Sequence, residues 1–133
     1  MNGFNVTNTL SKSYTHKVAG TILQQVRQPN YWVYGSWGVS KMYFIEVDGK
    51  PGLIMRVNGA ALRGEVAILL NEGADLYEVW MRRYTGNHNK FICMGDGIYF
   101  DMLQDFIDKR VESCSKRDLN IMFAEAMIQA DAA

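Results

Sequence analysis

The chain has 133 residues, of which 48% are apolar and 21% are charged, and its Lys and Arg residues balance its Asp and Glu residues at zero net charge. This length suits one domain, which can bury about two-thirds of its unfolded surface and so fold without a metal ion or a disulfide. The zero balance argues against a DNA mimic, because such a protein needs a strong negative charge to compete for basic grooves.

The sequence favours a cytoplasmic location. Cys93 and Cys114 fit no metal-ligand spacing and no disulfide framework, which favours reduced thiols. The first residues contain no apolar run of signal-peptide length, and no segment is long enough to span a membrane. We therefore expect one domain over residues 1–133, without a membrane partner.

The zero net charge hides an asymmetry along the chain. Residues 1–95 hold ten basic and six acidic side chains, a net of +4, whereas residues 96–133 hold four basic and eight acidic ones, a net of −4. The basic part can serve an anionic partner. Alternatively, the two parts attract each other within the fold, and the sequence leaves both interpretations open.

The chain begins with a polar segment and a helix. Residues 1–12 are rich in Asn, Thr and Ser, and we expect a loose arm there. Ser13 or Thr15 can cap a helix that ends near Gln28, before Pro29. The helix carries an apolar stripe at four-residue spacing, formed by Val18, Ile22 and Val26.

Six stretches with strand-like patterns follow, separated by turn sequences such as DGKPG (48–52) and TGNHN (85–89). These stretches are 31–37, 39–47, 53–58, 65–71, 75–84 and 90–94. The connections are too short for a crossover helix, so the strands should form an antiparallel meander.

The clearest of these strands is 75–84, DLYEVWMRRY. Tyr77, Val79 and Met81 fall on one side, while the other side mixes polar, charged and aromatic residues. Such alternation is typical of a strand with one face on a core and one face open to solvent.

The period changes from two to 3.6 residues after Gly97, which predicts a helix ending near Ser113. Ser115 and Asp118 resemble a capping box for a last helix over 115–133. The predicted fold is α+β: an antiparallel meander of about five or six strands, packed on one face by an N-terminal helix and two C-terminal helices.

Catalytic and metal-binding patterns are weak. Asp101, Asp105, Asp108 and Glu112 share one helical face, but a metal ion usually draws its oxygen ligands from more than one element. A solvated acidic face is the better interpretation, and a metal-assisted hydrolase is kept only as an alternative.

Other groups suggest no reaction either. His16 and His88 lie in no ligand spacing, and Cys93 has no base nearby in sequence. The stretch GDG (95–97) could present amides to a phosphate, but a tight turn between strand and helix explains it better. We predict no catalytic residue, metal ligand or cofactor.

The solvent-facing side of the sheet is the candidate binding surface. The side chains expected to face the helices are Ile45, Met55, Ile68, Val79 and Met81; those expected on the open face include Phe44 and Glu78. The predicted binding residues combine cations and aromatics: Arg56, Trp80, Arg82, Arg83, Tyr84 and Lys90.

Three interpretations of this surface stay open. Aromatics between cations on an open sheet hold single-stranded nucleic acid by stacking and phosphate contact. A protein-binding patch is also rich in Trp, Tyr, Arg and Met. Alternatively, the same residues pair across strands and only stabilise the sheet.

Three motifs resemble a family of short uncharacterised proteins from phages and mobile elements: AGTILQQ (19–25), LYEV (76–79) and GIYFDMLQDF (97–106). Their order and spacing are similar to the family pattern over residues 18–107. Arg27, Gln28 and Pro29 stand where that family has a glycine pair, and residues 115–133 extend beyond its usual end. The resemblance implies a phage or mobile-element source and no assigned activity.

Together these features predict a small non-catalytic binding protein in the host-cell cytoplasm. By analogy with other small phage proteins, a protein partner such as a host defence component is expected first. A single-stranded nucleic acid is the alternative partner.

Overall fold

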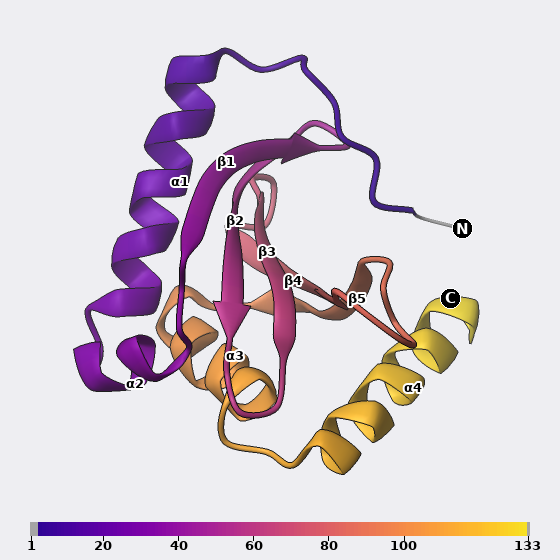
Figure 1. The fold of residues 1–133 in the computed structure, drawn as a ribbon. Coiled ribbons are helices and arrows are strands. Elements are labelled where there is room, and N and C mark those ends of the chain that lie inside the picture. The colour runs from indigo at the N-terminus through magenta and orange to yellow at the C-terminus, as the bar shows by residue number, and fades with distance from the viewer. Residues whose placement is uncertain (1–2, 133) are drawn as a thin grey trace.

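A five-stranded antiparallel sheet forms the centre of the protein, with helices packed against one of its faces (Figure 1). The computed structural model describes residues 3–132. The elements in chain order are α1 (Lys12–Arg27), α2 (Tyr31–Ser36), β1 (Lys41–Val47), β2 (Lys50–Asn58), β3 (Arg63–Asn71), β4 (Leu76–Arg83), β5 (Ile92–Ile98), the 3-10 turn η1 (Phe100–Met102), α3 (Leu103–Val111) and α4 (Lys116–Ala132). The predicted α+β meander is confirmed.

Each strand pairs with its neighbours in sequence, in the order β1-β2-β3-β4-β5. The β1–β2 hairpin turns through two residues, Asp48 (φ 51°) and Gly49 (φ 76°). Positive φ at both positions is the type I′ geometry that matches the strand twist. Strand β2 therefore starts at Lys50, earlier than the sequence predicts.

Residues 31–36 are a helix, so the strand predicted at 31–37 is wrong. The side-chain oxygen of Asn30 accepts hydrogen bonds from the amides of Trp32 (3.0 Å) and Val33 (3.3 Å) and caps this turn. An N-cap satisfies amides that no helical carbonyl can reach, and here it prevails over the strand preference of the aromatic residues.

The last strand and the following helix also differ from the prediction. Strand β5 covers Ile92–Ile98, so the GDG stretch lies within the strand rather than in a turn before a helix. Helix α3 starts only at Leu103, after the η1 turn. Tyr99, which falls within the predicted helix, lies before η1 and is 59% exposed.

Of the two helix caps predicted from the sequence, one is wrong and one is confirmed. The α1 cap is Ser11, whose hydroxyl accepts from the amide of Tyr14, so the predicted caps, Ser13 and Thr15, lie two and four residues too late. The predicted cap of α4 is confirmed, because the amide of Asp118 donates to the hydroxyl of Ser115 at 3.0 Å.

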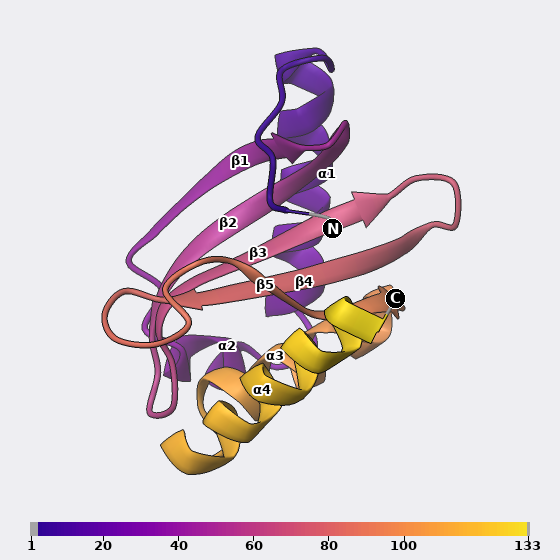
Figure 2. The same ribbon diagram turned by 90° about the vertical axis from the view of Figure 1, so that its right-hand side faces the viewer.

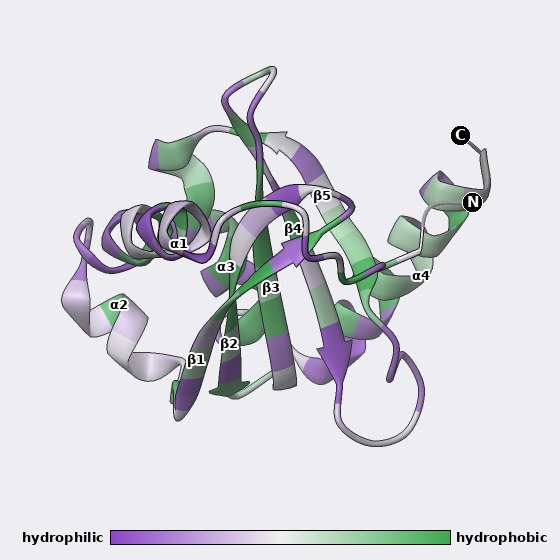
Figure 3. Cartoon of the chain, turned by 90° about the horizontal axis from the view of Figure 1, so that it is seen from above, coloured by the Kyte–Doolittle hydropathy of each residue, from purple (hydrophilic) through white to green (hydrophobic). Residues whose placement is uncertain are grey.

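The main core lies between the helices and the face of the sheet that we call the inner face. Residues Met55, Ile68, Val79 and Met81 of the sheet are fully buried there. They meet the apolar faces of α1 and α3, and Leu119 and Phe123 of α4. Figure 3 shows α1 and α3 to one side of the sheet and α4 beyond β5, so α4 covers the otherwise free edge of the meander. This burial confirms the predicted inward set, except for Ile45.

The opposite face, which we call the outer face, carries a second and smaller core of Val47, Ile54, Ala67, Leu69 and Trp80. Ile45 packs against this cluster, whereas Phe44 stacks on His16 of α1 with ring centroids 5.1 Å apart. Both faces of β1 are therefore the reverse of those predicted. The two-residue hairpin fixes this register, because Val47 pairs with Lys50 and Phe44 with Leu53.

Candidate binding surface on the outer sheet face

Cations gather at one end of the outer face. Residues paired directly across antiparallel strands share a face, and the pairing runs Lys41–Arg56–Glu65–Arg82 from β1 to β4. Arg63 alternates with Glu65 along β3 and so has the same orientation. We call Lys41, Arg56, Arg63 and Arg82 the basic end; it lies at the left of the sheet in Figure 2.

One buried carboxylate organises the basic end. Glu65 accepts from Arg82 through Nε (2.7 Å) and Nη2 (2.6 Å) and from the hydroxyl of Tyr43 (2.8 Å). Burial and this hydrogen bond raise the pKa of Tyr43 to about 12. Arg82 is therefore held rigidly, while Lys41, Arg56 and Arg63 are exposed and lie in no ion pair among the described residues.

Tyr84 lies between two of these cations. The Arg56 guanidinium is 4.6 Å from the centroid of its ring and that of Arg82 is 5.3 Å away, distances at which a cation attracts an aromatic face. Burial and the charge of Glu65 raise the pKa of Tyr84. Arg56 and Arg82 lower it, but by less, so the pKa is raised overall. The structure thus brings together three of the predicted binding residues: Arg56, Arg82 and Tyr84.

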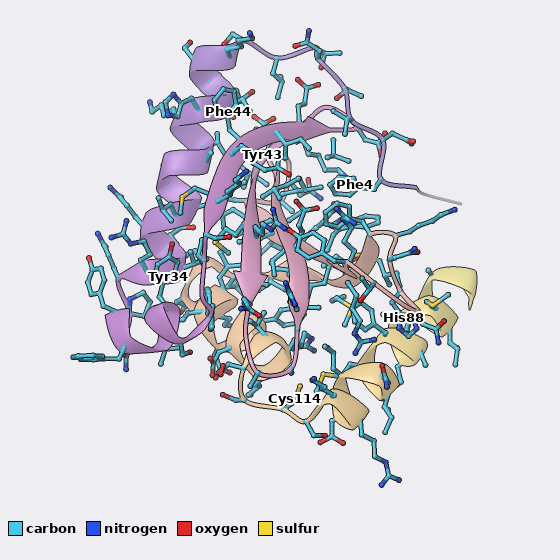
Figure 4. All side chains as sticks on the ribbon, viewed as in Figure 1. Phe4, Tyr34, Tyr43, Phe44, His88 and Cys114 are labelled. Carbon is cyan, nitrogen blue, oxygen red and sulfur yellow. The ribbon has the colours of Figure 1, made fainter. Side chains whose placement is uncertain are left out.

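Trp80, expected to be open, is only 8% exposed. The chain before α1 crosses the outer face (Figures 1 and 2), and Phe4 of this segment lies against the Trp80 ring at 5.5 Å between centroids. Phe4 also stacks on Phe91 at 4.2 Å. Figure 4 shows Phe4 on the side of the sheet away from α1. Trp80 is therefore covered by the arm and is not open to solvent as predicted.

We call residues 3–10 the arm, and Glu46 fixes it. This carboxylate, 5% exposed, accepts from the hydroxyls of Thr7 and Thr9 and from the amides of Thr9 and Leu10. Burial alone would raise the pKa of Glu46, but the four hydrogen-bonding groups of the arm outweigh it and lower the pKa to about 2. A bridge between Val6 and Val47 adds backbone pairing at the β1 edge.

A groove of about 560 Å³ opens beside Trp80, between the arm, the start of β5 and the last turns of α4. We call it the arm groove. Its lining is mostly apolar, with the predicted residues Arg82 and Lys90 at the rim; the apolar residues are Phe4, Trp80, Phe91, Ile92, Cys93 and Met127.

Arg83, the remaining predicted binding residue, faces the other way. Its guanidinium lies 5.1 Å from the Phe123 ring of α4 and its Nη1 is 3.2 Å from Nδ1 of His88. His88 stacks on the same ring, and burial followed by the charge of Arg83 lowers the pKa of His88. Arg83 thus attaches α4 to the sheet and lies outside the outer face.

The four helical carboxylates do not converge. Asp108 accepts from Nε1 of Trp37 (2.9 Å), Glu112 accepts from the amide of Ala60 (3.1 Å), and Asp105 pairs with Lys109 (2.9 Å). Among the described residues, no three His, Cys, Asp or Glu side chains are placed to hold a metal ion. Asp108 and Glu112 therefore hold neighbouring segments in place, whereas the sequence suggested only an acidic face exposed to solvent.

The thiol of Cys93 lies in the arm groove and points toward the carbonyl of Gly95 (3.6 Å). Burial, with a further contribution from Glu78, raises its pKa to about 11. A thiol with such a pKa is a poor nucleophile at neutral pH, because the thiolate is the reactive form.

Three residues of this surface were missing from the sequence prediction: Lys41, Arg63 and Tyr43. The hairpin register could have found Lys41 and Tyr43, because a two-residue turn at Asp48 and Gly49 pairs Lys41 with Arg56. Arg63 depends instead on the pairing of β2 with β3. The contribution of Phe4 had no local signal, since it comes from the far end of the chain.

Cations lie on both sides of the sheet. The basic end lies on the outer face, while α1, on the inner side, carries Lys12, Lys17 and Arg27, and the two acidic and two basic residues of α3 balance each other. The ion pairs among the described side chains, residues 3–130, are Lys50–Glu78, Arg82–Glu65 and Lys109–Asp105, and none of them joins the basic part of the chain to the acidic part. Direct ion pairing therefore does not account for the asymmetry in the sequence.

No helix in the described part of the chain is long and apolar enough to cross a membrane. Comparison of the chain with protein-family models, with curated proteins and with solved structures finds no match.

Proposed function

We propose that this protein is a small binding protein whose outer sheet face holds a single-stranded nucleic acid. The observation that carries the proposal is the basic end: four cations on four adjacent strands, one of them fixed by Glu65 and three exposed. Such an array suits the phosphates of a flexible strand, because phosphate contacts supply most of the affinity for nucleic acid.

Aromatic side chains stand beside these cations. Tyr43 is 47% exposed, and Tyr84 and Phe91 are half-buried on the same face. Unpaired bases stack on such rings without regard to sequence.

The test compares two triple variants that lose the same charge. Lys41→Gln, Arg56→Gln and Arg63→Gln remove the exposed part of the basic end, and Lys109→Gln, Lys116→Gln and Arg117→Gln remove three exposed cations of the helices. Fluorescence anisotropy of a labelled oligothymidylate measures the Kd at low salt.

We expect the outer-face variant to bind at least tenfold more weakly than wild type and the helix variant to bind within about twofold of it. Equal losses in both variants would mean that net charge alone drives binding. No binding by the wild-type protein at low salt would reject the proposal.

A second candidate is the binding of a protein partner at a different place. Tyr31 and Trp32 of α2 are 57% and 90% exposed. The amide of Gln104 donates to the carbonyls of Val26 and Asn30, both at 2.9 Å, and so holds the start of α3 beside α2. The residues just before α3 are also exposed aromatic or apolar ones: Tyr99, Phe100 and Met102.

We call these five residues the helical corner. Exposed Trp, Tyr, Phe and Met side chains are typical of protein interfaces. Affinity purification after nuclease treatment tests this corner. Trp32→Glu should lose the partner, whereas Ile121→Glu, a matched change at an exposed position of α4, should retain it. Retention by both variants would reject the corner as the interface.

We further propose that the protein comes from a phage or mobile element and acts in the host-cell cytoplasm. The similarity of residues 18–107 to the phage-type pattern supports the source. Two cysteines without a disulfide suit a reducing compartment. Cell fractionation of a tagged chain tests the location.

A further inference from the structure

We infer that the arm groove binds a small organic anion with an aromatic body. This inference concerns one side of the outer face only and goes beyond the proposed function, because it requires no polymer and no contact with Lys41, Arg56 or Arg63.

The size and lining of the groove suit a small molecule. Its volume of about 560 Å³ falls within the range of small-molecule sites, roughly 300 to 1,000 Å³. Phe4 and Phe91 stack at 4.2 Å, and Trp80 meets Phe4 edge-on. Met127 of α4 lines the groove as well, and its flexible side chain adapts to the shape of an apolar ligand.

The rim of the groove selects a negative charge. Arg82 and Lys90 are its charged residues, and no Asp or Glu is among the described residues that line it. Lys90 is exposed and takes part in no described ion pair. The described lining therefore offers two cations and no carboxylate to a ligand, while the nearby Glu65 and Glu78 are paired with Arg82 and Lys50.

Arg82 is held in place before any ligand arrives. The Nε and Nη2 groups of Arg82 donate to Glu65. The ring centroids of Tyr84 and Phe91 lie 5.3 Å and 5.5 Å from the guanidinium carbon of Arg82. Its Nη1 group donates only a long hydrogen bond of 3.5 Å to the carbonyl of Asn89, which also lines the groove. A guanidinium fixed in this way loses little entropy when an anion binds.

The probe for this inference is anilinonaphthalene sulfonate (ANS), an aromatic anion, compared with phenylnaphthylamine, which has the same rings and no sulfonate. We expect ANS to bind one saturable site per chain, about tenfold more tightly than the neutral probe. Equal affinity of the two probes, or unsaturable binding of ANS, would overturn the inference.

Two neighbouring substitutions locate the site. Met127→Glu places a carboxylate in the groove and should weaken ANS binding about tenfold or more, whereas Ile128→Glu, at a residue that is 67% exposed and outside the lining, should not. Near-ultraviolet circular dichroism checks that both variants keep wild-type packing, because ANS also binds loosely packed states. Unchanged ANS affinity in a folded Met127→Glu variant would contradict the inference.

The ANS experiment can succeed or fail independently of the nucleic-acid experiment. The Lys41, Arg56 and Arg63 triple variant, which is expected to lose oligothymidylate, should bind ANS as wild type does. If nucleic acid fails to bind at all, the ANS result stands unaffected; if ANS binding disappears in the triple variant, the groove is not a separate site and the inference is wrong.

Discussion

At the scale of single residues, two buried carboxylates determine how the outer face is built. Glu46 fixes the arm through two hydroxyls and two amides, and Glu65 fixes Arg82 and Tyr43. Each carboxylate is buried, and each is surrounded by donors, as a buried charge requires. The first supports the covered part of the face and the second supports its basic end.

Replacing Glu46 should change how stability depends on pH. The pKa of Glu46 is about 2 in the folded protein and 4.5 in the reference state, so its contribution to stability is present above pH 4.5 and is lost as the pH falls toward 2. Glu46→Gln should therefore be less stable than wild type at pH 7 and should lose less stability between pH 4.5 and pH 2.

Urea denaturation at pH 7, 4.5 and 3 measures this difference, and Glu125→Gln, on the exposed side of α4, is the control. The role of Glu46 in fixing the arm is contradicted if Glu46→Gln and wild type lose the same free energy of unfolding on acidification.

Cys93 should be almost inert in the folded protein. With a pKa of about 11, roughly 0.1% of the thiol is ionised at pH 8. Its alkylation by iodoacetamide at that pH should be about a hundredfold slower than in the urea-unfolded chain, as followed by mass spectrometry of the peptide that contains it. Alkylation at equal rates in the two states would show that the thiol is not shielded beside Trp80.

At the scale of elements, hydrophobic periodicity predicted those strands and helices in which the pattern of neighbouring residues decides which face is buried. Tyr77, Val79 and Met81 are buried in the main core as their alternation predicted, because packing on one face imposes a period of two on a strand. Glu78 and Trp80, expected on an open face, are buried as well, so that part of the prediction is wrong. The prediction failed at α2, where one capping side chain, Asn30, outweighs the strand preference of the aromatic residues.

The same cap gives a prediction for α2. Asn30→Ala should lower the free energy of unfolding by about 1 kcal/mol, because the amides of Trp32 and Val33 lose their acceptor. Asn30→Asp keeps an acceptor at this position and should stay close to wild type. Urea denaturation compares the three proteins, and a loss in Asn30→Asp as large as that in Asn30→Ala would mean that the cap is not what holds α2.

The candidate site was predictable in part. Arg56, Arg82 and Tyr84 meet because side chains two residues apart on a strand share a face, and Lys90 reaches the rim of the groove. Trp80 and Arg83 were misplaced because their surroundings come from distant segments, Phe4 of the arm and Phe123 of α4. No sequence period predicts such long-range packing.

At the scale of the whole molecule, the register of the meander gathers a local group of cations. It brings Lys41, Arg56, Arg63 and Arg82 of β1 to β4 together at one end of the outer face, at the left of the sheet in Figure 2. A protein of zero net charge can therefore present a positive surface to an anionic partner.

The central claim is that the exposed cations of the basic end neutralise phosphates, and the salt dependence of oligothymidylate affinity tests it most directly. A plot of log Kd against log salt concentration should be steep for wild type. In each of the variants Lys41→Gln, Arg56→Gln and Arg63→Gln, one cation is lost. The slope of each variant should be smaller than that of wild type by about 0.7 for each phosphate contact that is lost. A slope unchanged in all three variants would contradict the claim.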